Sequence, residues 1–148
     1  MEIQKINRSE YKEVVDLWEA SVRATHHFLE EDDILFFKPL ILNEYLDAVE
    51  LRCTRDEKSE ISGFSGVAGK NLEMLFIHPD HRGNGLGEKL LKNAIEEFEI
   101  SHVDVNEANE QALKFYQKYG FKTYSRSEKD PTGRPYPILH MALDHKLL

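Results

Sequence analysis

Three glycines within five residues separate a predicted strand from a predicted helix, and this segment constrains the fold more than any other. Residues 82–87 read Arg-Gly-Asn-Gly-Leu-Gly, after an apolar run that ends near Ile77 and before an amphipathic helical pattern. Glycines let the backbone turn sharply and approach a ligand, while the N–H groups and dipole of a helix start favour phosphate oxygens. The sequence therefore predicts an anion site, to which Arg82 or Lys89 adds a cation.

The spacing of these glycines excludes two common nucleotide motifs. It departs from the dinucleotide pattern Gly-x-Gly-x-x-Gly, and no Gly-Lys-Ser or Gly-Lys-Thr closes a phosphate loop. A glycine-rich turn that only starts a helix is the plain alternative for the segment taken alone.

Apolar periodicity predicts an α+β chain. Helices are expected from a cap at Ser9, from the acidic run at Glu30 with a kink at Pro39, from Leu86, and from Ala108 to a stop at Gly120. Strands are expected over residues 2–7, 48–54, 61–68, 72–78, 101–105, 121–127 and 138–143.

The connections between these elements predict the sheet topology. Short polar gaps at 55–60 and 69–71 favour an antiparallel meander, in which Gly63 and Gly66 weaken the middle strand or mark a bulge. The helical crossover between strands 72–78 and 101–105 favours a parallel pair. We therefore expect one domain over 1–148, with a mixed, mostly antiparallel sheet and helices on both faces.

Composition excludes some partners. The formal charge of −8 opposes a phosphate backbone, so nucleic acid is not expected, whereas an acidic surface suits cationic amines. The single cysteine, Cys53, lies in a predicted core strand and is expected to be a buried, inert thiol. No apolar run is long enough for a bilayer and no signal-peptide stretch is seen, so we expect a cytoplasmic protein without membrane contact.

Two motifs in order and spacing resemble the GNAT family of acetyl-coenzyme A-dependent N-acetyltransferases. Arg82, Gly85 and Gly87 match the family's pyrophosphate motif, Gly83 fits its common Arg-Gly form, and residues 75–79 resemble the strand that pairs with the pantetheine arm. The second motif, Asn-x-x-Ala-x-x-Phe-Tyr-x-x-x-Gly-Phe, is matched by Asn109, Ala112, Phe115, Tyr116, Gly120 and Phe121.

The resemblance implies the GNAT fold, whose central parallel strands splay apart around the thioester, and acetyl-CoA as co-substrate. It implies that an amine attacks the thioester directly and that Tyr116 donates a proton or hydrogen bond to the leaving sulfur. The residues expected to bind the coenzyme are Phe76, Ile77, Arg82, Gly83, Asn84, Gly85, Leu86, Gly87 and Asn109. From the pattern alone, Tyr116 could equally belong to an apolar stripe, and Asn109 could be a helix cap.

An alkyl ammonium with a pKa of about 10.4 must lose a proton before it attacks. Glu73 is the candidate base, because some family members carry a carboxylate in this strand, and a solvated strand residue is its alternative.

The segments Thr25-His26-His27-Phe28 and Pro135-Tyr136-Pro137 resemble a bacterial GNAT subgroup whose acceptors are poorly defined. They imply that His26, Phe28 and Tyr136 shape the acceptor pocket, with His26 as a possible proton relay, unless they only pack a junction and a turn. No ligand spacing supports a metal at the adjacent histidines.

A binding module that senses acyl-coenzyme A without transferring it is the alternative function, because a coenzyme loop predicts binding more firmly than turnover. The acceptor stays open among small amines, protein N-termini and lysine side chains, and a homodimer rests on the resemblance alone.

Overall fold

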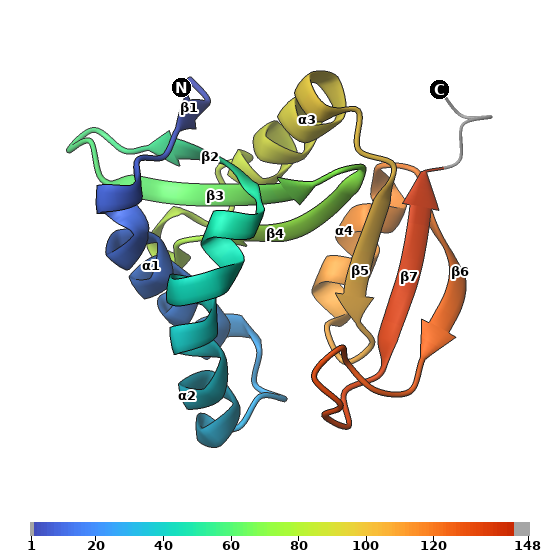
Figure 1. Cartoon of the computed structure of the whole chain (residues 1–148). Helices are drawn as coiled ribbons and strands as arrows, with labels where there is room; N and C mark the ends of the chain where they lie inside the picture. Colours follow the sequence, from blue (N-terminus) through green and yellow to red (C-terminus); the bar gives the residue numbers. More distant parts are fainter. Residues whose placement is uncertain (1, 144–148) are drawn as a thin grey trace. The chain divides into compact units, whose positions relative to one another are not determined.

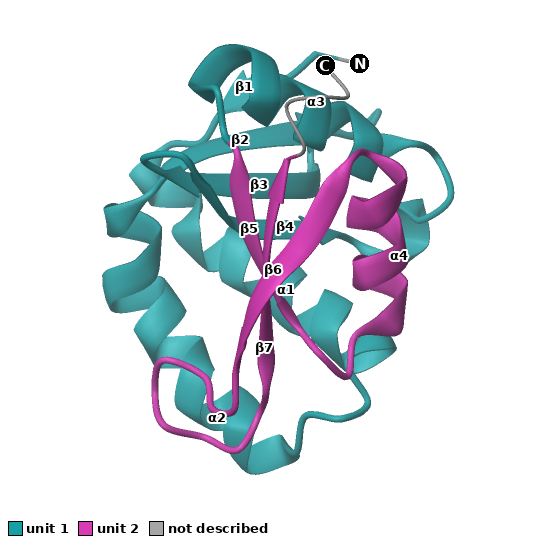
Figure 2. Cartoon of the chain, turned by 90° about the vertical axis from the view of Figure 1, so that its right-hand side faces the viewer, with its two compact units in different colours: residues 1–100 teal, residues 101–148 magenta. Residues whose placement is uncertain are grey.

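The computed structural model describes residues 2–143. The chain divides into two compact units, residues 1–100 and residues 101–148 (Figures 1 and 2). Each unit has its own sheet segment and its own helices. Elements of both kinds follow one another along the chain, which confirms the predicted α+β class.

Unit 1 is built on an antiparallel meander. Its strands follow the spatial order β1 (Gln4–Lys5), β2 (Glu50–Arg55), β3 (Ile61–Ala68) and β4 (Asn71–Ile77). The His78 N–H donates to the Ser62 carbonyl over 2.8 Å, so the chain stays tied to β3 for one residue beyond β4. The meander confirms the prediction from the two short polar gaps.

Helices cover both faces of this meander. α1 (Tyr11–Thr25) and α2 (Glu31–Leu40) lie on one face, where Phe64 joins a core that includes Val14, Trp18 and Ile34. α3 (Leu86–Phe98) packs on β2, β3 and β4. Because successive strand residues point to opposite faces, the contact of Gly63 with Leu90 of α3 places that helix across the sheet from Phe64.

The start of the chain differs from the prediction. Only Gln4 and Lys5 form a strand, and a 3₁₀ turn at Arg8–Glu10 precedes α1. Ser9 is not a cap. Asn7 caps the turn instead, in a capping box with Glu10, because the chain turns two residues earlier than the apolar pattern indicates.

Pro39 does not end the second helix. The helix passes through it and widens into a π-helix at Ile41–Tyr45 and a 3₁₀ turn at Leu46–Ala48. Proline lacks an N–H and crowds the carbonyl four residues before it, which disturbs the regular bonding pattern. The extra helical turns delay β2 to Glu50, two residues after the predicted start.

The expected irregularity in the meander is a bulge in β4. Gly66 pairs with Met74 and Val67 pairs with Leu72, so Glu73 is the extra residue. Gly63 has a different role, because a Cβ there would lie 2.7 Å from Ile77 Cδ1 and 3.2 Å from Leu90 Cδ1. Glycine therefore lets α3 and the end of β4 approach each other closely.

An ion pair fastens α3 to the sheet. Arg52, which is 8% exposed, donates to Glu97 of α3 through Nε and through Nη2, the latter over 2.7 Å. The Arg52 guanidinium also lies 4.8 Å from the centre of the Phe98 ring. The Arg52 guanidinium holds the pKa of the Glu97 carboxyl below its ordinary value.

Unit 2 is an antiparallel group of strands with one helix. β5 (His102–Asn106) pairs with β7 (Ile138–Leu143), which pairs with β6 (Phe121–Ser127), and α4 (Glu110–Lys118) packs on β6 (Figure 2). α4 begins after Asn109 because the Asn109 side chain accepts a hydrogen bond from the Ala112 N–H over 3.1 Å. The buried residues here are Val103, Val105, Tyr116, Phe121, Met141 and Leu143.

The expected parallel pairing of strands 72–78 and 101–105 would join the two units and stays a prediction. Within residues 2–143, every helix is too short or too polar to cross a lipid bilayer.

We expect Glu97→Gln to lower the free energy of unfolding by about 1–2 kcal/mol, because the nearly buried Arg52 loses its charged partner while Glu97 itself is partly exposed. Urea unfolding followed by circular dichroism measures the change. The matched control is Glu96→Gln, an exposed neighbour on α3, with an expected change below about 0.5 kcal/mol. Equal losses in both variants would contradict the role of the ion pair.

Candidate functional site

The glycine-rich segment forms an exposed loop between β4 and α3. A 3₁₀ turn at Pro79–His81 leads into it, and the N-cap of α3 is Gly85. Gly83 and Gly85 have φ angles of +84° and +77°. An added Cβ at either would meet no atom within 4 Å, so the left-handed backbone and not crowding requires glycine.

This loop fits an anion. The first N–H groups of a helix have no acceptor inside the helix, and Gly85 offers them no side-chain cap. Arg82, Asn84 and Gly85 are exposed, whereas Leu86 is buried and anchors the helix start. The residues that would hold the coenzyme pyrophosphate are therefore presented to solvent from a fixed base.

The predicted acceptor residues of unit 1 lie beside the predicted coenzyme strand. The His26 ring lies 5.2 Å from that of Phe28 and 6.1 Å from that of Phe76, between ring centres. Phe76 in turn lies 5.7 Å from Phe64 of the core. The loop between α1 and α2 is thus packed onto β4 through His26.

Hydrogen bonding assigns the tautomer of His26. The Thr25 hydroxyl donates its only proton to the Ser21 carbonyl over 2.8 Å, and the Thr25 Oγ1 to His26 Nδ1 distance is 2.7 Å. Thr25 Oγ1 must therefore accept from Nδ1–H. In the neutral imidazole Nε2 then carries the lone pair, which suits a proton acceptor.

Burial lowers the pKa of His26 to about 4, and the Arg82 guanidinium and His27 add to this effect. His26 is therefore neutral at pH 7. The influence of Arg82 on His26 shows that the coenzyme loop and the predicted acceptor loop are electrostatic neighbours within unit 1.

Glu73 occupies the bulge of β4 and is exposed. A bulge redirects a side chain relative to the regular alternation of a strand. Its solvent-exposed position matches the plain alternative from the sequence, while its place in β4 keeps it a candidate base.

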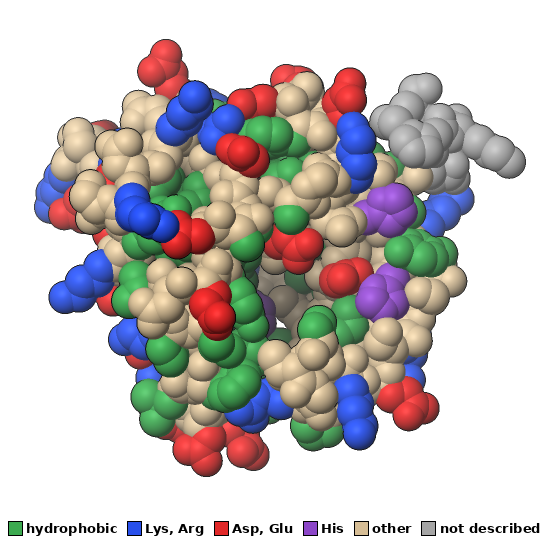
Figure 3. All heavy atoms as spheres, viewed as in Figure 1, with side chains coloured by type: hydrophobic (Ala, Val, Ile, Leu, Met, Phe, Trp, Pro, Cys, Tyr) green, Lys and Arg blue, Asp and Glu red, His purple; other side chains and the backbone are tan. Residues whose placement is uncertain are grey.

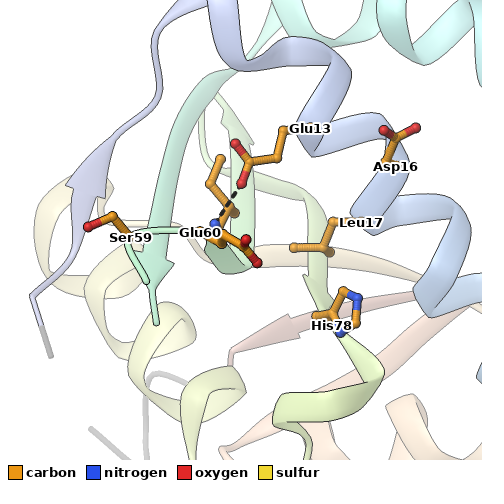
Figure 4. A pocket seen from close by; sticks show the side chains of 7 residues that line it. Glu13, Asp16, Leu17, Ser59, Glu60 and His78 are labelled. Carbon is orange, nitrogen blue, oxygen red and sulfur yellow. Dashed lines mark hydrogen bonds between the residues drawn. The ribbon is translucent and has the colours of Figure 1, made fainter. Parts of the chain in front are cut away.

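An acidic depression adjoins the glycine-rich loop and was not predicted from the sequence. One hollow of about 440 Å³ lies between α1 and the β2–β3 hairpin, with walls that include Glu13, Asp16 and Glu60 (Figure 4). A second hollow of about 550 Å³ shares Glu60 and His78 with it and reaches Asn84 of the loop. The Glu13 carboxylate accepts from the Ile61 N–H over 2.8 Å, which fixes one wall.

Carboxylates dominate the lining of the two hollows. The acidic lining residues are Glu13, Asp16, Asp56, Glu57, Glu60 and Asp80, and the basic or imidazole lining residues are Lys58, His78 and His81. Because these residues come from distant segments, no local pattern could have revealed them; only the excess of acidic residues in the composition hinted at a negative surface.

Unit 2 holds the remaining predicted residues. Tyr116 on α4 is 7% exposed and its ring lies 5.6 Å from that of Phe121, and burial raises the pKa of its phenol. Asn109 caps α4, as its alternative role anticipated. Tyr136, in the loop between β6 and β7, is half-buried, and its N–H donates to the Arg134 carbonyl over 2.8 Å.

Metal ligands do not gather in the described part of the chain: residues 2–143 contain no group of three or more His, Cys, Asp or Glu side chains placed to hold an ion. His26 is half-buried and His27 is exposed.

A family model described as an acetyltransferase (GNAT) domain matches residues 41–141. Peptidyl-lysine N-acetyltransferase YjaB of Escherichia coli K12 is 38% identical over 140 residues, which cover 95% of each protein. The solution structure of apo YjaB from Escherichia coli gives a TM-score of 0.84, again with 38% identity and 95% of both chains covered.

A more distant structure shows the same fold with coenzyme A present. The PaiA N-acetyltransferase of Thermoplasma acidophilum, solved in complex with coenzyme A, gives a TM-score of 0.71 at 21% identity and covers 94% of this chain and 96% of its own. The family match and the YjaB relationship support transfer over the sensor alternative, because the relatives are named as transferases. The chain therefore belongs to the GNAT family and is an acetyl-CoA-dependent N-acetyltransferase.

Proposed function

We propose that this enzyme acetylates lysine side chains of proteins or peptides. The observation that carries the proposal is the acidic depression next to the coenzyme loop, which lies in an enzyme 38% identical to a peptidyl-lysine N-acetyltransferase. Clustered carboxylates raise the local concentration of a cationic segment, and this steering weakens with salt. A lysine flanked by basic residues fits this field better than a neutral or acidic peptide.

The coenzyme is bound, in this proposal, along the end of β4 and the start of α3. Phe76 and Ile77 supply the strand, Arg82 pairs with a pyrophosphate oxygen, and the N–H groups from Gly83 to Gly87 donate to the others. Asn84 is exposed on the loop, whereas Leu86 is buried and anchors it. Asn109, the cap of α4, is also proposed to bind the coenzyme. Acetyl-CoA supplies the thioester whose acetyl group is transferred.

Two groups are candidates for taking the proton of the lysine ammonium. Glu73 offers a carboxylate from the bulge of β4, directly or through water. His26 offers Nε2 from the acceptor loop, although a pKa of about 4 makes it a weak base suited to relaying a proton. Being uncharged, His26 also lets a cation approach. His26 and Phe28 of unit 1, and separately Tyr136 of unit 2, are proposed to contribute to acceptor binding.

Tyr116 is proposed to assist departure of the sulfur. Its burial keeps the phenol protonated, and a phenol with a raised pKa gives up its proton less readily than a thiol does. Donation of a hydrogen bond to the leaving thiolate is therefore favoured over complete proton transfer. No covalent intermediate on the enzyme is needed.

The two compact units are proposed to act as one catalytic domain, because the family match at 41–141 runs through both. A cytoplasmic location suits the acetyl-CoA requirement and the single buried thiol, Cys53.

A thiol-release assay with acetyl-CoA tests the function. We expect release with lysine peptides carrying basic flanks, little with the same peptides flanked by glutamate, and a loss of this preference at high salt. Preference for a small amine over every lysine peptide would contradict the proposed acceptor.

Gly85→Glu tests the coenzyme loop, since it places a carboxylate against the pyrophosphate and strains a left-handed position. We expect acetyl-CoA binding, measured by calorimetry, to weaken at least about tenfold, as one misplaced charge costs more than 1.4 kcal/mol. Gly69→Glu is the matched control, because Gly69 is also exposed with a φ of +60° and open space around it but lies outside the loop. Equal weakening in both would remove the loop from the coenzyme site.

Tyr116→Phe is expected to lower kcat about 10²-fold, the lower end of what acid catalysis contributes, with little change in the KM for acetyl-CoA. Steady-state kinetics measures both constants. The matched control is Tyr119→Phe, at the C-cap of the same helix with its ring 5.1 Å from that of Phe115, and it is expected to keep kcat. An unchanged kcat in Tyr116→Phe would end the assignment without affecting family membership.

The neutrality of His26 predicts a pH dependence of stability. Its pKa is about 4 in the folded chain and about 6.5 when unfolded, so unfolding takes up a proton between these values, and stability falls as pH falls through this window. We expect this group to remove about 2–3 kcal/mol between pH 7 and pH 4. Urea titrations at pH 7 and at pH 4 should therefore show that His26→Gln loses less stability than the parent chain as the pH falls, by about this amount.

A further inference from the structure

Three side chains of unit 2 form a hydrogen-bonded row that the acetyl transfer does not use. Asp104 of β5, His140 of β7 and Ser127 of β6 come from three neighbouring strands. The Asp104 Oδ1 to His140 Nδ1 distance is 2.6 Å, and the His140 Nε2 to Ser127 Oγ distance is 2.7 Å. Both imidazole nitrogens are thus engaged, one by a carboxylate and one by a hydroxyl.

The sheet register sets up this row. Asp104 and His140 are direct cross-strand partners, and Ser127 pairs with Ile138, two residues before His140. A bulge at Tyr124, between the pairs Thr123–Met141 and Ser125–His140, shifts β6 by one residue just before Ser127. Without that shift, the alternation of β6 would turn Ser127 to the other face.

Proton positions follow from the chemistry of the three groups. An ionised carboxylate only accepts hydrogen bonds, so Nδ1 of His140 carries a proton and donates it to Asp104. In the neutral imidazole Nε2 is then the acceptor, and the Ser127 hydroxyl donates to it. The serine proton therefore points at a base whose orientation is held by a carboxylate, as in an activated nucleophile.

The row is open to solvent. The Asp104 side chain is 59% exposed, that of His140 is 24% exposed and Ser127 is half-buried, so a small molecule can approach the row from solvent. Tyr124, which is 60% exposed, lies beside it with its ring 6.3 Å from His140. Figure 3 shows histidine side chains at the surface over these strands.

We propose that Ser127 is a nucleophile that accepts acyl groups from small activated esters, with His140 as general base and Asp104 as the residue that positions it. Ser127 Oγ forms a bond to the acyl carbon, its proton passes to His140 Nε2, and the bond to the leaving alcohol breaks as that proton is returned to the leaving oxygen. Water then cleaves the acyl-serine by the same route. General-base assistance accelerates a reaction by only about 10²–10⁴-fold. The expected acyl donors are therefore esters whose leaving groups depart readily.

A purely structural row that ties three strands together is the competing explanation. It predicts that loss of Ser127 or Asp104 changes stability only. The acyl-acceptor role predicts a covalent product on one particular hydroxyl, which a structural role does not produce.

p-Nitrophenyl acetate, with the full chain and no acetyl-CoA, is the probe. We expect a burst of nitrophenolate and an acetyl group on the peptide that contains Ser127, found by mass spectrometry. Both should disappear in Ser127→Ala and persist in Gly85→Glu, which separates this chemistry from the coenzyme site. Ser125→Ala is the matched control, since Ser125 lies opposite His140 in the same strand and its loss should change nothing.

Asp104→Asn should slow acylation at least about tenfold, because the amide no longer fixes the Nδ1–H tautomer. Thermal unfolding of each variant shows whether the fold is kept. If Ser127→Ala does not fold, Asp104→Asn takes its place as the test variant. Acylation that is unchanged in Ser127→Ala, equally slowed in Ser125→Ala, or found only on lysines would overturn the proposal.

Discussion

The close packing of α3 on the meander of unit 1 is the constraint on which the coenzyme loop depends. A helix can present its first N–H groups to an anion only if its start is held in place, and here Leu86, Leu90, Leu91 and Ala94 are buried against the strands. Gly63 removes the side chain that would separate α3 from Ile77, and Arg52 fastens the far end of the helix through Glu97. The loop is then exposed yet anchored on both sides, by β4 before it and by α3 after it.

The electrostatic potential differs between two neighbouring parts of unit 1. The loop gathers positive potential from Arg82 and the helix start, whereas the adjoining depression is lined by carboxylates such as Glu13 and Glu60. Under the proposed function, these opposite fields would attract an anionic co-substrate and a cationic acceptor to neighbouring places. His26 stays neutral beside the loop, because its burial and the nearby Arg82 oppose a further positive charge.

Much of the candidate site could be predicted from the sequence because its signals are local. The left-handed glycines, the apolar face of α3 and the Asn109 cap each depend on residues within a few positions of one another. The errors were local as well. The pattern around Ser9 could not distinguish the Asn7 cap, and nothing in the sequence pattern indicated the π-helix that follows Pro39, since neighbouring packing decides such choices.

Features built by distant residues could not be predicted in this way. The acidic depression joins α1, the β2–β3 hairpin and the residues after β4, and the Ser127–His140–Asp104 row needs the register of three strands and the bulge at Tyr124. The sequence by itself determined the family, the α+β order and the place of the glycine-rich loop, because helix and strand periodicity and glycine spacing depend on residues that are close together in the chain. Only the tertiary structure decided the tautomer and low pKa of His26, the place of Glu73 in a bulge and the side chains that meet across strands. Burial, register and hydrogen bonding exist only once separate segments are brought together.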